Sequence, residues 1–226
     1  QAARGYFATA HDQSEEPLTS TLLLAISWYA IGEKDKARSL IGEVLKIDPL
    51  NLPALYTLSR LENPVSGQLL PKLERLLKDD YAYYFDLACF FLEVGLPKVA
   101  LEILTIAWHH KQQPLIAYLA GYTCSLLHQD MESKEWFKKA RTCSPELAFP
   151  SRLHEVLALE HALKQNENDH LALYCLGNFY YAHERFDEGI HFWESAKKGF
   201  LKFDVIYRNL GLAHWERQQD GEKAIT

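Results

Sequence analysis

The 226-residue sequence lacks long apolar runs and has no excess of basic residues. No apolar run approaches the roughly 20 residues of a transmembrane helix, so no membrane span is predicted. The formal net charge of -6 argues against nucleic acid or an anionic membrane surface, since both attract a basic face. We therefore expect neither a nucleic-acid partner nor a membrane partner.

Cysteine is scarce and scattered. The four residues, Cys89, Cys124, Cys143 and Cys175, show neither a CxxC pair nor the spacing of a zinc site. Three of them fall within apolar helical runs. Buried free thiols in a reducing compartment are the expected state, which predicts a cytoplasmic protein without disulfides.

Motifs of catalysis are also missing. The sequence contains no Walker A loop, no GxGxxG and no GxSxG. His161 follows His154 by seven residues, not by the four of a zincin helix, and no third ligand is evident. We expect no catalytic residue, metal or cofactor here, and therefore no enzyme in this part of the protein.

What the sequence does contain is a recurring pattern of small and large residues. The first copy consists of Leu24, Ala25, Trp28, Gly32, Ala37, Ile41, Val44 and Pro49. Further copies include Tyr84, Leu87, Ala88, Phe91, Gly95 and Ala100; Ala120, Gly121, Phe137 and Ala140; Leu176, Gly177, Tyr180, Trp193 and Ala196; and Tyr207, Leu210 and Gly211. A small residue in each helix lets two helices of a hairpin approach closely, while large residues fill the space around them.

The pattern predicts helices and no strands. The expected pairs are 17–31 with 33–47, 51–62 with 66–78, 81–94 with 96–110, 114–128 with 131–142, and 169–183 with 186–199, before a last helix at 203–217. The pair at 51–78 is a degenerate copy. An apolar helical periodicity predicts one extra helix at 151–165, with Ser151 as its N-cap.

These residues resemble the tetratricopeptide repeat (TPR) superfamily over roughly residues 18–226. The resemblance implies an all-α fold, a right-handed α-solenoid of about five to six hairpins, spanning 17–226 with its last repeat truncated. Residues 1–16 are expected to be a linker or the end of a preceding helix. We expect both ends to be cuts in a longer polypeptide.

Four segments of the sequence resemble a narrower group of proteins. They are residues 149–155, 163–169, 174–181 and 207–215. They are similar to the C-terminal half of large bacterial proteins whose N-terminal domain is β-rich, sugar-enzyme-like and of unknown function. The resemblance implies that this chain is the repeat region of such a protein and carries none of its catalytic residues.

In the TPR architecture the first helix of each hairpin lines a concave face. The register places these candidate partner-binding residues there: Tyr29, Phe85, Tyr118, Tyr122, Tyr174, Asn178, Tyr181, Arg208, Asn209 and Trp215. Aromatic side chains and arginine bury much area with few rotamers to freeze. No lysine joins Asn178, Arg208 and Asn209, so capture of a peptide's terminal carboxylate is not predicted.

Two functions remain open. The first is a non-catalytic scaffold whose aromatic concave face binds a protein or peptide, another subunit, or a missing domain of its own chain. The alternative is the ancillary C-terminal half of a bacterial carbohydrate-active enzyme. The groove is equally expected to be filled, either by the missing domain or by the extra helix, because large apolar patches are rarely left uncovered.

Overall fold

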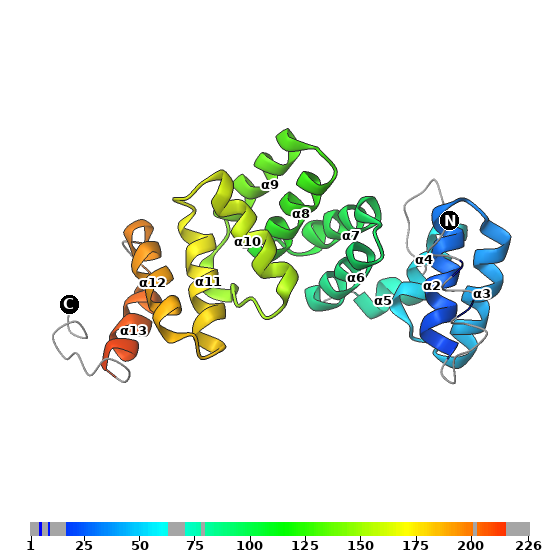
Figure 1. The fold of residues 1–226 in the computed structure, drawn as a ribbon, viewed down its shortest axis with the longest axis horizontal. Coiled ribbons are helices and arrows are strands. Elements are labelled where there is room, and N and C mark those ends of the chain that lie inside the picture. Colours follow the sequence, from blue (N-terminus) through cyan, green and yellow to red (C-terminus); the bar gives the residue numbers. More distant parts are fainter. Residues whose placement is uncertain are drawn as a thin grey trace. The chain divides into compact units, whose positions relative to one another are not determined.

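The computed structural model describes residues 5, 9, 17–62, 71–77, 80–200 and 203–215. Every regular element in these ranges is a helix, which confirms the all-α class (Figure 1). The elements are α2 (Pro17–Ala30), α3 (Lys34–Ile47), α4 (Leu52–Glu62), α5 (Pro71–Leu77), α6 (Tyr81–Glu93), α7 (Pro97–His110), α8 (Pro114–Leu126), α9 (Asp130–Arg141), η1 (Pro145–Leu147), α10 (Leu153–Gln165), α11 (His170–Ala182), α12 (Phe186–Ala196), η2 (Lys197–Gly199) and α13 (Asp204–Ala213).

The observed helices match the predicted ones closely. Most ends differ by only one or two residues, which is the ordinary uncertainty of a helix terminus. Parts of three expectations lie outside the described residues. These are most of segment 1–16, the start of the helix expected at 66–78, and the end of the one expected at 203–217.

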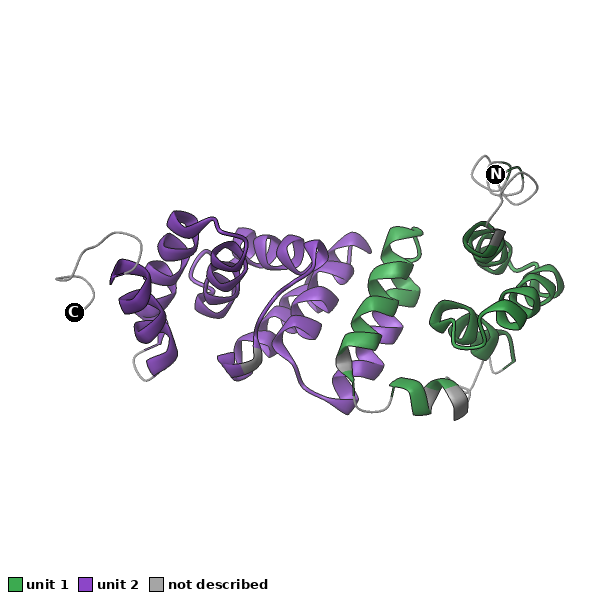
Figure 2. Ribbon diagram, turned by 90° about the horizontal axis from the view of Figure 1, so that it is seen from below, with its two compact units in different colours: residues 1–100 green, residues 101–226 purple. Residues whose placement is uncertain are grey.

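The chain divides into two compact units, residues 1–100 and residues 101–226 (Figure 2). In the first, α2 and α3 form a hairpin, α4 packs on both, and α6 contacts α4 and α5. In the second, α8 pairs with α9, α11 pairs with α12, and α13 packs on α12. A single continuous solenoid over 17–226 stays a prediction.

Glycines let the hairpins of the second unit close. A Cβ atom at Gly121 would lie 2.5 Å from the ring of Phe137, and one at Gly177 would lie 2.3 Å from the indole of Trp193. Both distances are well below van der Waals contact, so the first helix can present no side chain at these positions. The predicted packing of a small residue against a large one is therefore confirmed in both hairpins.

The extra helix is confirmed as α10, but its predicted N-cap is wrong. α10 begins at Leu153, and the side chain that caps it is the carboxylate of Glu155. This carboxylate accepts hydrogen bonds from the backbone N–H groups of Ser151 and Arg152, at 2.6 and 2.7 Å. A charged acceptor binds exposed N–H groups more strongly than a hydroxyl does.

The insertion changes what α8 and α11 contact. α10 packs against both helices, while Asp169 caps the N-terminus of α11 by accepting from the N–H of Ala172 at 3.1 Å. Asp169 is fully buried, and its carboxylate also accepts from the hydroxyl of Tyr118 at 2.7 Å and from Arg141 at 3.4 Å. Burial, followed by the charge of Asp169, holds the pKa of Tyr118 well above its usual value. The start of α11 is thereby tied to α8 and α9.

Candidate partner-binding site

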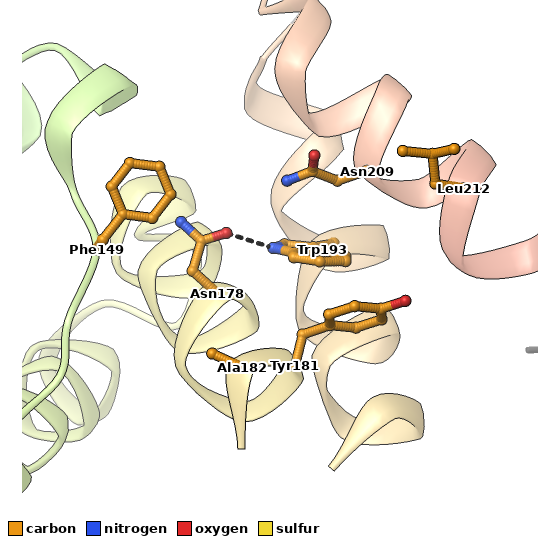
Figure 3. A pocket seen from close by; sticks show the side chains of 7 residues that line it. All are labelled: Phe149, Asn178, Tyr181, Ala182, Trp193, Asn209 and Leu212. Atoms are coloured by element: carbon orange, nitrogen blue, oxygen red, sulfur yellow. Dashed lines mark hydrogen bonds between the residues drawn. The ribbon is translucent and has the colours of Figure 1, made fainter. Parts of the chain in front are cut away.

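A pocket of about 320 Å³ opens within the second unit (Figure 3). Three helices and the link before α10 contribute its lining. The lining residues are Phe149, Asn178, Tyr181, Ala182, Trp193, Asn209 and Leu212. The three from α11 share one helix face, as residues three and four positions apart do, and so do the two from α13.

Trp193 of α12 forms the floor of this pocket. Its side chain is only 4% exposed, and its indole N–H donates to the Oδ1 atom of Asn178 at 3.0 Å. The ring of Tyr181 packs on the indole, with 4.8 Å between centroids and 31° between planes. The absent side chain at Gly177 gives the indole its place, so the floor follows from the hairpin packing.

Asn178 also fixes the link before α10, whose Phe149 forms the side of the pocket opposite α13. Its Nδ2 atom donates to the backbone carbonyl of Ala148 at 3.1 Å. Ala148 and Pro150 are buried, whereas Phe149 between them is 57% exposed and faces the pocket (Figure 3). This wall exists because the inserted segment passes alongside α11.

The third side belongs to α13. Leu212 is 51% exposed, and Asn209, one turn before it, is half-buried. Arg208 is exposed and donates to the Oδ1 atom of Asn209 at 3.2 Å. The lining residues carry no formal charge, so the pocket suits a bulky uncharged group. Arg208 places a positive charge at the rim of the pocket. The lining offers no acid–base pair.

The structure brings three of the predicted site residues together. Asn178, Tyr181 and Asn209 line the pocket, and Arg208 borders it through its bond to Asn209. Trp215 is 65% exposed directly after α13 but does not line the pocket. The predicted register is thus consistent with the position of the pocket on α11 and α13.

Others of the predicted residues lie inside the protein, and their placement as accessible contacts is corrected. Tyr118 and Phe85 are fully buried. Tyr122 is half-buried, with its ring 5.6 Å from that of His161 on α10. The extra helix therefore fills the inner face of α8, as one of the alternatives above anticipated. Tyr29, on α2 in the first unit, is half-buried.

Tyr174 is also buried, behind the aromatic link that precedes α13. Its ring lies 6.0 Å from that of Phe200 and 5.1 Å from that of Phe203. Its hydroxyl has no hydrogen-bond partner within the described ranges. Burial raises its pKa, and the nearby Asn178 amide and the charge of Arg208 offset part of that rise.

Four lining residues were not predicted. Ala182 and Leu212 occupy inner-face positions of the register, so the repeat pattern carried a signal for both. Trp193 was assigned to hairpin packing, and it serves both purposes because its edge reaches the pocket. Phe149 lies in a link outside the repeat pattern, where periodicity gives no signal.

The histidines of α10 form no ligand set. His161 lies beside the rings of Tyr122 and Phe137, and burial, followed by the charge of Lys164, lowers its pKa, with Asp130 opposing. In the described part of the chain, no three histidine, cysteine or acidic side chains come together. No described helix combines the length and apolarity needed to cross a membrane.

Within the described residues, the helices pair most closely as α2–α3, α8–α9 and α11–α12. No family model matches the chain. Among solved structures it is similar to MamA at 19% identity, with 89% of this chain and 88% of that chain covered and a TM-score of 0.32. It is also similar to MamA 41-end from Desulfovibrio magneticus RS-1, at 20% identity. That match covers 64% of this chain and 89% of that chain, with a TM-score of 0.29.

A further similarity is to YrrB, described as a TPR protein with an unusual peptide-binding site. The identity is 15%, the coverage is 97% of this chain and 87% of that chain, and the TM-score is 0.31. The paired helices and their close glycine contacts establish an all-α fold in the described ranges.

Proposed function

We propose that this chain is a non-catalytic interaction module that binds a segment of another protein or of another domain. A bulky apolar side chain of that segment enters the pocket and packs on Trp193. The observation that carries the proposal is the grouping of Phe149 and Leu212, both more than half exposed, around a buried indole. Apolar surface gathered over an aromatic floor is typical of interface hot spots.

The size of the pocket favours a peptide anchor. Its volume of about 320 Å³ lies at the lower end of the range for small-ligand sites. One large side chain and part of its backbone fill such a space, whereas a folded domain needs a larger surface. A segment of a second subunit, or of a missing domain of the same protein, would bind by the same contacts.

The test is selection of a random-peptide phage library on the intact chain. We expect enriched peptides to share a bulky apolar residue and to lose about tenfold in affinity when both Phe149 and Leu212 are replaced by alanine. Anisotropy with labelled synthetic copies of the peptides measures the loss. Circular dichroism checks that the helical content of the variant is unchanged.

Leu126→Ala is the matched control. Leu126 is 47% exposed on α8 and does not line the pocket, so this change removes exposed apolar area, as Leu212→Ala does, without touching the site. A library that yields no binder, or binders equally weakened by Leu126→Ala, would contradict the proposal. Binding of soluble oligosaccharides in place of peptides would favour the carbohydrate-enzyme alternative, since sugars also stack on aromatic walls.

A further inference from the structure

The carboxamides at the pocket are oriented by their neighbours. An indole N–H and an arginine can only donate, so the atom facing each of them must be the amide oxygen. The indole N–H of Trp193 therefore donates to Oδ1 of Asn178, and the guanidinium of Arg208 donates to Oδ1 of Asn209. Asn178 also spends one of its N–H donors on the carbonyl of Ala148.

Each amide oxygen thus already accepts one hydrogen bond, while an amide donor of Asn209 is left for an occupant of the pocket. No hydrogen bond from the Nδ2 atom of Asn209 is formed within the described residues. In Figure 3 that nitrogen is turned toward the side of the pocket where Phe149 and Asn178 lie. An occupant that brings hydrogen-bond acceptors satisfies these groups, whereas a second donor would leave them unpaired.

The charge at the rim points the same way. In the described part of the second unit, Arg141 pairs with Asp169, Arg152 with Glu155 and Arg185 with Glu188. Arg208 forms no ion pair there, although its guanidinium already contacts the pocket amide. It is the arginine of that region left without a carboxylate.

We propose that the partner segment carries an acidic side chain next to its bulky apolar residue. The apolar side chain packs on Trp193, and the carboxylate accepts hydrogen bonds from Asn209 and Arg208. Planar guanidinium and carboxylate groups match one another in geometry, and charge-assisted bonds are stronger than neutral ones. The inference rests on the proposed function and adds the chemistry of the ligand.

The probes are acetylated and amidated Gly/Ser nonapeptides with one central pair, Phe-Glu, Phe-Gln or Ala-Glu, each made in both orders. The caps remove terminal charges, so the glutamate carries the one carboxylate. Titration into the ¹⁵N-labelled chain follows the indole N–H resonance of Trp193. We expect the better Phe-Glu order to bind about fivefold more tightly than Phe-Gln, and Ala-Glu to leave the resonance unmoved.

Arg208→Gln separates the charge from the apolar anchor. It should weaken the Phe-Glu peptide about fivefold and leave the Phe-Gln peptide unchanged, which is the pattern of a direct pairwise interaction. Arg185→Gln is the matched control, because Arg185 is exposed in the same unit, lies outside the pocket and pairs with Glu188. It should leave the affinity of both peptides unchanged.

Three results would overturn the inference. Equal affinity of Phe-Glu and Phe-Gln peptides, with the Trp193 signal moving for both, refutes the acidic residue while the apolar anchor stands. Tighter binding of an uncapped peptide ending in Phe than of the Phe-Glu peptide assigns the donors to a chain terminus instead. If no Phe peptide moves the Trp193 resonance, the proposed function fails together with the inference.

Discussion

At the scale of single residues, the absence of a side chain matters as much as its presence. Gly177 lets α12 place its indole directly against α11, and that indole is then held by Asn178 and Tyr181. A ring fixed from two sides cannot move aside cheaply. The same glycine thus controls both hairpin packing and the floor of the pocket.

Gly177→Ala should therefore be destabilising although alanine favours helices. A Cβ atom 2.3 Å from Trp193 forces overpacking that costs about 1–3 kcal/mol. Gly42→Ala is the control, because Gly42 is exposed in α3 with nothing within 4 Å of the new methyl group. That change should be neutral or stabilising by about 0.5–1 kcal/mol. Thermal melts compare the two, and similar shifts would show that the helix register is misassigned.

At the scale of elements, the insertion that carries α10 is the main departure from a regular repeat. It covers the inner face of α8, supplies Phe149 to the pocket, and ends at the buried cap Asp169. One carboxylate joins α11 to both helices of the preceding hairpin through Tyr118 and Arg141. The end of the insertion is thereby anchored to that hairpin.

Asp169→Ala should cost about 2–4 kcal/mol of unfolding free energy. Loss of an N-cap accounts for about 1 kcal/mol, and a buried tyrosine hydroxyl left without its acceptor accounts for about 1–3 kcal/mol. Asp80 caps α6 in the same way by accepting from Ala82 at 2.9 Å, but it is exposed. Asp80→Ala should therefore lose only about 1 kcal/mol in urea unfolding, and equal losses would refute a buried network.

At the scale of the whole molecule, stability in a helical repeat is a sum of local hairpin and neighbour contributions. The strongest contacts in each unit join helices adjacent or nearly adjacent in sequence. Damage at one hairpin is then expected to remain near it. A substitution in one compact unit should therefore have the least effect on residues of the other unit.

Hydrogen–deuterium exchange of the Asp169→Ala variant tests this. Backbone amides of α8 to α12 should exchange faster than in the wild type, because local opening there becomes less costly. Amides of α2 to α4 in the first unit should keep their protection. Acceleration spread evenly over the chain would indicate a single cooperative unit and contradict nearest-neighbour behaviour.

The class of fold, the hairpin register and the existence of α10 could all be predicted from the sequence alone. These follow from local and periodic information: small residues at fixed intervals, apolar spacing of 3.6 residues, and capping and turn residues between helices. The same register indicated Asn178, Tyr181 and Asn209, through the inner-face positions that the resemblance to tetratricopeptide repeats implied.

Which of those positions stay accessible depends on long-range packing and could not be predicted from the sequence. Tyr118 and Phe85 have the same register signal as Tyr181, yet they are buried, because exposure depends on what packs against a helix. Phe149 lies at the site because the backbone carbonyl of its neighbour Ala148 accepts a hydrogen bond from Asn178, which is far from it in sequence. Repeat periodicity specifies the face of a helix, whereas long-range packing determines whether that face is covered.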